Sequence, residues 1–222
     1  MRIYRSPIGK KLITGITGLA LATFVLAHML GNLLLFVGRD AYNTYAYRLE
    51  QVWPVFYTIE AVLLISGLFH ATVGIQIFWA KRQARPIGYR AYQSAGAPSH
   101  QSISSRTMIV TGSVLAVFLV SHLLTFKFGV VYSTAIAGVE SRDFSRLVIE
   151  TFKNPLYAFG YAAVTVMLGF HLRHGIWSAL QSLGAMSRGL KPVVYGLGSL
   201  LAVLIAVGFV ILPLAIYGGW VG

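Results

Sequence analysis

The sequence contains no cysteine, and this absence excludes several kinds of chemistry. Without a thiol the chain can form no disulfide, bind no iron–sulfur cluster through its own residues and offer no thiolate ligand to a haem. The same absence removes the usual indication of an oxidising or a reducing compartment. Any metal or redox chemistry of this chain therefore depends on other side chains.

Charged residues are scarce, at 11% of the chain, whereas hydrophobic residues make up 56%. The mean hydropathy is +0.70, and a soluble domain usually has about 25% charged residues. We therefore predict an integral membrane protein. Acidic residues are the rarest, with 6 Asp and Glu against 18 Lys and Arg. Because the basic residues lie in short segments between apolar runs, they are typical of loops at a membrane surface, and no nucleic-acid partner is expected.

Five apolar stretches have the length of about 20 residues that a helix needs to cross a bilayer. They run approximately over residues 12–37, 53–80, 108–128, 155–183 and 193–217. The basic N-terminal segment leads into an apolar run longer than the core of a signal peptide, so we interpret that run as the first helix. The sequence predicts an all-α integral membrane protein with five transmembrane helices in a single transmembrane domain, residues 1–222.

Lys and Arg are unevenly distributed between the segments that connect the spans. The N-terminus and the segments after the second and fourth spans hold more basic residues than the two segments on the opposite side, which hold most of the acidic ones. Since segments rich in Lys and Arg stay in the cytoplasm, we expect a multi-pass protein of the inner (cytoplasmic) membrane. Its N-terminus would be cytoplasmic and its C-terminus outside.

Histidine occurs in four consecutive spans. The six histidines are His28 in the first span, His70 in the second, His122 in the third, His171 and His174 in the fourth, and His100 in a polar segment where we interpret it as solvated. Ionisable side chains inside a bilayer are rare and usually functional. For any single one, a neutral histidine hydrogen-bonded between helices is the alternative. Four spans that each carry one favour a shared site.

The depths of these histidines follow from a rise of about 1.5 Å per helical residue. The first and third helices run outward and place His28 and His122 in the outer half of the membrane. The second and fourth helices run inward and place His70 and His171 in the inner half. Two level pairs are what two stacked b-type haems need, with one imidazole on each face of each porphyrin. We therefore expect the first four helices to form a dihaem-binding bundle.

A local repeat supports the choice of ligand in the fourth span. The second span reads FHATVGI from Phe69 and the fourth reads FHLRHGI from Phe170, so the same Phe-His and Gly-Ile pairs recur at the same spacing. This repeat favours His171 over His174 as an iron ligand.

Glycines follow several of these histidines along the helix. Gly74 and Gly175 each lie one turn after a histidine, on the same face, where the lack of a side chain could admit a macrocycle. Gly31, three residues after His28, could serve in the same way. Close packing between helices is the alternative for each of them.

A few polar residues near the histidines are further candidates. Arg173 and His174 adjoin His171 and could partner haem propionates, whereas Lys10, Lys11, Lys81 and Arg82 flank the cytoplasmic edge, where some will only reach lipid phosphates. Glu60 lies about two turns into the second span. It could aid proton movement at a quinone site, or it could reach the outer interface without a chemical role.

The arrangement as a whole resembles a known family. The five-span order, the histidines in helices one to four with none in helix five, and the string FHLRHGIWSALQSLG from Phe170 to Gly184 resemble the dihaem cytochrome b subunit of succinate:quinone oxidoreductases, or complex II. The resemblance extends over nearly the whole chain. By motif it implies that His70 and His171 ligate the proximal haem, and that His28 and His122 ligate the distal one.

The resemblance also implies a place in a larger enzyme. The chain would anchor a flavoprotein subunit with FAD, which oxidises succinate in the tricarboxylic acid cycle, and an iron–sulfur subunit, both on the cytoplasmic side. Electrons would pass from the iron–sulfur subunit through two haem b groups to a membrane quinone, menaquinone more readily than ubiquinone. Some dihaem relatives carry a glutamate two residues before the histidine of helix four for proton movement. Gly169 stands there in this chain, which counts against such a route.

Other functions remain open at this point. A quinol:fumarate reductase anchor has the same architecture with the net electron flow reversed. A proton-relay transporter without haem is an alternative from another class, although a relay would scatter its histidines along one path. The haem b subunit of a nitrate reductase or hydrogenase is disfavoured by the single FHxxxGI histidine in each of helices two and four. We place quinone reduction near the outer haem, beside His28 and Glu60, with a site between the iron–sulfur subunit and the inner haem as the competitor.

The orientation can be tested directly, because the chain has no cysteine of its own. A cysteine in place of Gln93 should be hidden from a membrane-impermeant maleimide in intact cells, and a cysteine in place of Ser141 should react with it. The reason is the excess of Lys and Arg in the segment that holds Gln93. If only the Gln93 variant reacted, the orientation would be the opposite of the predicted one. The histidine pair that we place in the inner half of the membrane would then lie in the outer half.

Overall fold

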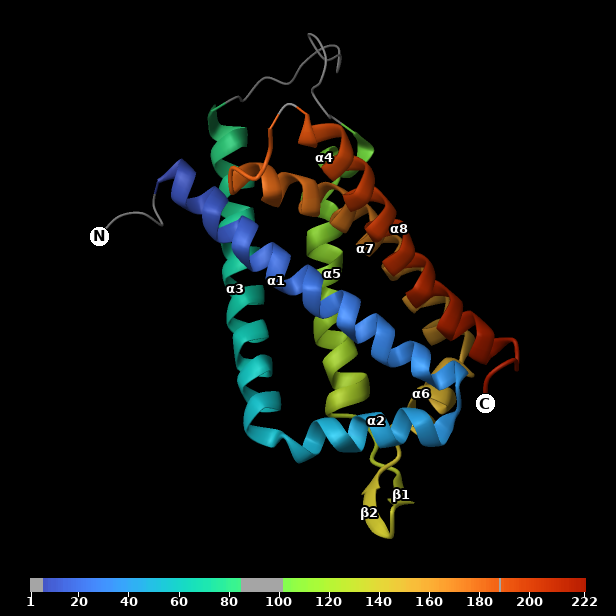
Figure 1. Cartoon of the computed structure of the whole chain (residues 1–222). Helices are drawn as coiled ribbons and strands as arrows, with labels where there is room; N and C mark the ends of the chain where they lie inside the picture. Colours follow the sequence, from blue (N-terminus) through green and yellow to red (C-terminus); the bar gives the residue numbers. More distant parts are fainter. Residues whose placement is uncertain (1–5, 85–101, 188) are drawn as a thin grey trace.

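The computed structural model describes residues 6–84, 102–187 and 189–222. Within these residues, five helices are long and apolar enough to cross a membrane (Figure 1). They are α1 with its 3₁₀ continuation η2 (Pro7–Leu33, Leu34–Phe36), α3 (Trp53–Ala84), α5 with its π-helical continuation η3 (Met108–His122, Leu123–Lys127), α7 (Pro155–Ser182) and α8 (Leu190–Tyr217). The predicted multi-pass helical architecture is confirmed to this extent.

Two of the long helices begin at capped ends. The Ser6 hydroxyl accepts a hydrogen bond from the Gly9 N–H at 2.9 Å, and the Asn154 side-chain oxygen accepts one from the Leu156 N–H at 2.9 Å. Each cap is followed by a proline in the first turn, where its missing N–H costs nothing. As a result α1 begins at Pro7, several residues before the apolar stretch that predicted it.

Short elements connect the long helices. The structure places α4 (Ile103–Arg106) at the end of the bundle that carries the N-terminus, and α2 (Arg39–Gln51), β1 (Ser133–Ile136), β2 (Val139–Arg142) and α6 (Phe144–Phe152) at the opposite end (Figure 1). We call this opposite end the outer end, after the predicted orientation. The sequence predicted only polar connecting segments there.

The two strands form a hairpin, which is the part of the fold that an all-α prediction misses. They pair antiparallel from Ser133 with Arg142 to Ile136 with Val139. The two-residue turn between them, Ala137–Gly138, has φ values of +52° and +80°. Both lie in the left-handed region that a tight hairpin turn of this length requires, and the glycine adopts it without steric cost.

Helix α8 is packed closely against α7 and α1, although it carries no histidine. A Cβ added to Gly169 of α7 would lie 2.8 Å from the Cβ of Ala206, and one added to Gly208 would overlap the Met29 side chain of α1. Ile205 between them is fully buried. Small residues let membrane helices approach in this way. The fifth helix is therefore part of the bundle that supports the histidine helices.

A buried polar cluster fastens α2 to α6 at the outer end. The Asn43 side chain, in a residue only 4% exposed, donates to Asp143 Oδ1 at 2.8 Å and to Ser145 Oγ at 3.1 Å. Its oxygen accepts from the Ser145 N–H at 2.9 Å, and Arg39 adds an ion pair to Asp143 at 3.5 Å. Because the groups satisfy one another, they can be buried together.

These contacts change the acidity of Asp143. Burial alone would raise the pKa of its carboxyl, but the hydrogen bond from the Arg146 N–H, those from Asn43 and Ser145 and the charge of Arg39 together hold the pKa below its ordinary value. The carboxylate therefore stabilises the folded state fully above the pKa of an unfolded aspartate, about 3.9. That contribution is lost as the pH falls through the lower folded pKa.

Removing the amide at the centre of this cluster should loosen the outer end. In Asn43→Ala the buried Asp143 carboxylate loses a donor, which should lower the local free energy of unfolding by about 1–3 kcal/mol. Hydrogen-exchange protection of the α6 amides measures the effect, and the wild-type protein should itself lose protection below about pH 4. Lys153→Gln, which removes an exposed ion pair on the same segment, is the matched control and should change little. Equal protection in Asn43→Ala and wild type would contradict a stabilising role for this polar cluster.

Candidate functional site

The structure brings the span histidines together as two pairs from non-consecutive helices. The ring centroids of His28 on α1 and His122 on α5 lie 5.8 Å apart, with an angle of 90° between the ring planes. Those of His70 on α3 and His171 on α7 lie 6.2 Å apart, at 67°. These are the partners that the depth argument predicted. We call His28 and His122 the outer pair, and His70 and His171 the inner pair.

The spacing of both pairs fits two imidazoles on one iron. A bond of about 2.0 Å from metal to imidazole nitrogen, plus about 1.2 Å from that nitrogen to the ring centre, puts two axial ring centroids about 6.4 Å apart. No group of three or more His, Asp or Glu side chains in the described part of the chain is arranged to hold a metal ion. A haem iron needs only two side chains, because the porphyrin supplies the other four ligands.

The inner pair is held through the Nδ1 atom of each ring. His70 Nδ1 lies 3.2 Å from the Thr14 carbonyl oxygen and 3.4 Å from the Thr17 hydroxyl, both on α1. His171 Nδ1 lies 3.1 Å from the Thr111 hydroxyl on α5. A carbonyl can only accept, so His70 carries its proton on Nδ1. The Nε2 lone pair of that ring is then available to a ligand, as in metal sites whose other ring nitrogen is held by an outer partner.

The Thr111 hydroxyl is placed to accept a hydrogen bond from His171 Nδ1. The same hydroxyl lies within donating distance of the carbonyl oxygens of Thr107, at 3.1 Å, and Met108, at 3.2 Å. With the hydroxyl hydrogen directed to one of these, the oxygen lone pair faces His171 Nδ1. The His171 ring then also presents Nε2. The role of these threonines could not be predicted from the sequence, since hydroxyls in a transmembrane helix usually bond only to their own backbone.

Glycines on the opposing helices make room for the two inner rings. A Cβ added to Gly18 of α1 would lie 3.0 Å from Cε1 of His70, and one added to Gly112 of α5 would lie 3.3 Å from Cε1 of His171. Gly74 and Gly175, which the sequence repeat singled out, have nothing within 4 Å of an added Cβ. The surface one turn after each inner histidine is thus open, as the admission of a flat macrocycle requires.

Gly31 differs from Gly74 and Gly175. A Cβ added there would lie 2.8 Å from Cε1 of Tyr45 and 2.9 Å from its hydroxyl oxygen. This glycine lets α2 pack against α1, so the space beside it is filled by a tyrosine. The alternative of close helix packing is the one that the structure supports at this position.

Aromatic rings surround the outer pair. Phe24 stacks on His28 with centroids 5.4 Å apart, and Phe209 of α8 lies 6.0 Å from the same ring. Phe118 and Phe126 lie 5.7 and 5.2 Å from His122, and Tyr161 lies 6.1 Å from it. Among the described residues, Nδ1 of His122 is buried without a hydrogen-bond partner. His122 therefore lies in an apolar aromatic environment, whereas both rings of the inner pair are hydrogen-bonded.

A short polar chain links His28 to the surface helix α2. Asn32 Nδ2 lies 3.4 Å from His28 Nε2, and the Tyr42 hydroxyl donates to Asn32 Oδ1 at 3.1 Å. Burial raises the pKa of Tyr42 to about 12, and Tyr45 nearby adds to this effect. Tyr42 consequently keeps its proton and acts as a donor at neutral pH.

Two hydroxyl groups hold the Arg173 side chain near the end of the bundle that carries the N-terminus of the chain. Arg173 donates to Ser104 Oγ at 3.3 Å and to Tyr195 Oη at 2.7 Å, and its guanidinium lies 5.4 Å from the centre of the Tyr195 ring. None of the ion pairs within the described ranges involves Arg173. His174 lies near enough to Lys81 and Arg173 for their charges to act on it. This end thus gathers positive charge without a neutralising carboxylate, and the predicted role toward propionates stays a prediction.

Glu60 forms an ion pair with Lys127, at the end of η3. Lys127 also lies 6.0 Å from the centre of the Tyr57 ring. The carboxylate therefore ties α3 to the outer end of α5, which is a structural role that the sequence did not predict. Its proposed role at a quinone site stays a prediction.

Some residues used in the sequence analysis lie outside the described residues. They are His100 and several basic residues of the segments from which the orientation was assigned: Arg2, Arg5, Arg85, Arg90 and Arg188.

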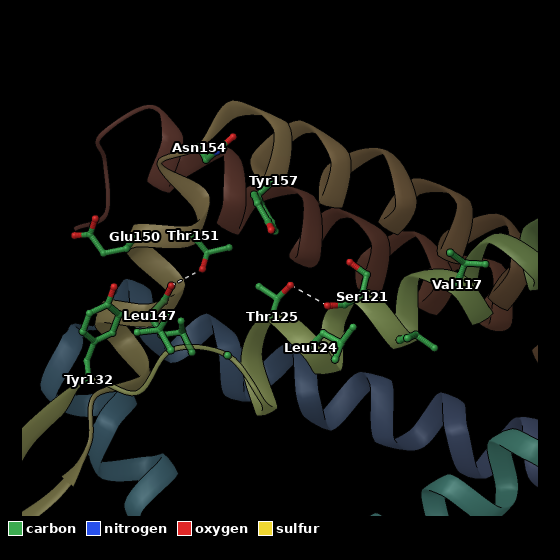
Figure 2. A pocket seen from close by; sticks show the side chains of 13 residues that line it. Val117, Ser121, Leu124, Thr125, Tyr132, Leu147, Glu150, Thr151, Asn154 and Tyr157 are labelled. Atoms are coloured by element: carbon green, nitrogen blue, oxygen red, sulfur yellow. Dashed lines mark hydrogen bonds between the residues drawn. The ribbon is translucent and has the colours of Figure 1, made fainter.

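A groove of about 910 Å³ lies along α5 at the outer end, between α5, η3, α6 and α7 (Figure 2). Ser121, the residue before His122, lines it, and Tyr157 of α7 faces it from the other side (Figure 2). This groove could not be found from the sequence, because its lining comes from several helices and the connection after η3, and their packing cannot be read from one helix at a time.

No protein-family model, curated protein or solved structure matches the chain. The resemblance to dihaem cytochromes b therefore stays a prediction from the sequence.

Proposed function

We propose that the chain is a dihaem cytochrome b that anchors a succinate:quinone oxidoreductase in the membrane. The observation that carries this proposal is the pair of imidazole–imidazole spacings, 6.2 Å for the inner pair and 5.8 Å for the outer pair. Either spacing alone would be compatible with two packed neutral histidines. Two such pairs, each between non-consecutive helices and at two different depths, match the ligand requirement of two haems.

The surroundings of the inner pair support ligation. The contacts to Thr14 and Thr111 hold Nδ1 of each ring, which orients the imidazoles and leaves Nε2 for an iron. The open surface at Gly74 and Gly175 fits the edge of a porphyrin. Bound haem would supply the one-electron chemistry, and the chain would supply ligands, orientation and a water-excluding environment.

The basic residues at one end of the bundle support an electron path across the membrane. Lys10, Lys11, Lys81, Arg82 and Arg106 lie toward the N-terminal end and give it the basic character that would face the iron–sulfur and flavoprotein subunits. Arg173 and His174 lie between this end and the inner pair and would hold the propionates of its haem. The inner and outer pairs would each hold one of the two haems that carry electrons from this end to a quinone, with menaquinone the expected species. A quinol:fumarate reductase anchor would use the same geometry in reverse.

The packing at Gly169 bears on how protons accompany these electrons. Ala206 of α8 leaves no room for even a methyl group there, so a carboxylate side chain would not fit without separating α7 from α8. With no such proton route at that position, electron transfer to an outer quinone would be assisted by the membrane potential, which is worth about 2.3 kcal/mol per charge and 100 mV.

Histidine substitutions test the ligation. His70→Ala and His171→Ala should each remove the same haem, and His28→Ala and His122→Ala should each remove the other, because each iron needs both imidazoles of its pair. Pyridine haemochrome content and redox-resolved spectra of the purified complex measure this. His100→Ala, at the histidine that the sequence places in a polar segment, should keep both haems and serves as the control. A colourless wild-type protein, or the same haem lost in all four variants, would defeat the proposal.

The hydrogen bond from His171 to Thr111 should set the inner haem potential. A partner that accepts from Nδ1 makes the imidazole a stronger donor and stabilises the oxidised iron. Thr111→Val removes the acceptor without changing the shape, so the inner midpoint potential should rise, by on the order of 40 mV if about 1 kcal/mol is lost. Thr111→Ser should restore the wild-type value. Potentiometric titration measures both, and a valine variant with unchanged potentials would show that the contact does not act on the iron.

A further inference from the structure

We propose that Arg142, on strand β2 of the hairpin at the outer end, is a positioning residue for His122. Its guanidinium caps the backbone at the end of η3, and this cap fixes the aromatic packing that orients the His122 ring. The inference rests on the dihaem function proposed above, because it concerns the orientation of one ligand of the outer pair. It assigns a role to the hairpin, which the all-α prediction did not contain.

The His122 ring is held by packing and not by a hydrogen bond at Nδ1. That atom is buried and has no hydrogen-bond partner among the described residues, whereas both inner rings are held at Nδ1. The rings of Phe118, Phe126 and Tyr161 lie 5.7, 5.2 and 6.1 Å from the His122 ring. Phe126 is the nearest of these three. The direction of the imidazole therefore depends on where the backbone places Phe126.

Phe126 belongs to the π-helical turn η3, which follows His122 directly. The Phe128 N–H donates to the Leu123 carbonyl, five residues earlier, at 2.9 Å, where an α-helix would use a spacing of four. The last carbonyls of a helix have no donor within it, and in a membrane protein they need one from another part of the chain. The π turn is a rare conformation, so its position depends on the groups that satisfy those carbonyls.

Arg142 supplies the missing donors. Its Nη2 donates to the Phe126 carbonyl at 2.9 Å and to the Val130 carbonyl at 3.4 Å. Its Nη1 donates to the Lys127 carbonyl at 3.1 Å. One planar guanidinium thus joins two carbonyls of η3 to the connection that follows, in a geometry fixed by its fork of N–H groups.

The hairpin and α6 hold Arg142 in place. In the strand register Arg142 pairs with Ser133, so its backbone is fixed where the chain returns from the turn (Figure 1). The guanidinium also lies 4.5 Å from the centre of the Phe144 ring, at the start of α6. The hairpin therefore brings a cation back to the helix end from which it departed.

A displacement of η3 would reach His122 by two routes. The first is the direct contact with Phe126. The second passes through Tyr161, whose ring lies 5.8 Å from that of Phe126. Phe152 of α6 lies at the same distance, 5.8 Å, from Phe126 and 5.2 Å from Tyr161, so these three rings move as one packed group. Loss of the cap should consequently change the orientation of His122 and leave the inner pair unchanged.

Arg142→Gln in the complex as it copurifies tests the cap. Hydrogen exchange in peptides covering residues 123–131 should become about tenfold faster, equivalent to about 1.4 kcal/mol. The largest g value of a low-spin ferric haem with two axial imidazoles depends on the angle between the ring planes, which is 90° for the outer pair. We expect the electron paramagnetic resonance signal of the outer haem to shift to a smaller largest g value, with the inner signal unchanged.

Arg146→Gln is the matched control. The Arg146 guanidinium lies 4.4 Å from the centre of the Tyr132 ring, so it has a comparable aromatic contact four residues further along the chain. Within the described ranges its side chain makes no hydrogen bond to η3. This variant should leave the exchange rates at residues 123–131 and both haem signals as in the wild type.

A double-mutant cycle with Phe126→Leu tests the route. Since Arg142 acts through the Phe126 ring, the shift caused by Arg142→Gln should be largely lost in the Phe126→Leu background. Equal shifts in the two backgrounds, an unchanged outer signal in Arg142→Gln, or an equal shift in Arg146→Gln would overturn the proposal.

The two proposals fail separately in this experiment. A wild-type complex with both haems, in which Arg142→Gln does not alter the outer signal, refutes only the positioning role. A colourless wild-type protein refutes the dihaem function, and nitrogen resonances of the labelled His122 ring then report its surroundings without haem. In that protein, a change of these resonances in Arg142→Gln but not in Arg146→Gln would support the positioning role, and unchanged resonances in both would refute it.

Discussion

The central constraint on this molecule is that a polar group inside a bilayer must find its partner within the protein. Backbone groups meet this requirement by forming helices, but an imidazole in the middle of a helix cannot be satisfied by its own backbone. Each inner histidine is consequently turned toward a neighbouring helix, where Thr14 and Thr111 meet its Nδ1 atom. The contact fixes both the position of the ring and the packing of the two helices. The glycines opposite, Gly18 and Gly112, follow from it, because any larger residue would displace the ring that the threonine holds.

The pairing of the histidines could be predicted from the sequence because helical rise converts residue number into depth. The helices of His28 and His122 begin on the same side of the membrane, and each histidine lies a similar number of residues after the start of its predicted span. The helices of His70 and His171 begin on the other side, and the same holds for them. The structure pairs them in that way. What the sequence could not provide is which residues of other helices face each ring. That depends on rotation about the helix axes, and a uniformly apolar helix gives little periodicity from which to read it.

Depth along a helix can be predicted from the sequence and contacts between helices cannot, and this also explains where the structure differs from the other predictions. The five spans were predictable because apolar length alone defines them. The α2 and α6 helices and the hairpin were not, since short polar segments carry weak patterns, and Asn43 and Asp143 show their purpose only when the two segments meet. For Gly31 the sequence left open both a place for a macrocycle and close helix packing, because spacing after a histidine cannot tell whether a neighbouring side chain fills the space, and here Tyr45 does. Glu60 and Arg173 were identified as unusual by depth, but their partners Lys127, Ser104 and Tyr195 come from distant parts of the chain.

The different surroundings of the two pairs give a direction to the proposed electron path. Hydrogen bonding at Nδ1 strengthens an axial imidazole and favours the oxidised iron, which lowers the potential of a haem on the inner pair. The outer pair has rings of Phe24, Phe118 and Phe126 around it, and His122 Nδ1 has no hydrogen-bond partner among the described residues. An apolar environment disfavours the extra positive charge of oxidised iron, so a haem there would have the higher potential. Electrons entering from the N-terminal end would then move to the outer pair downhill, and the structure would favour flow toward the outer end before any membrane potential is applied.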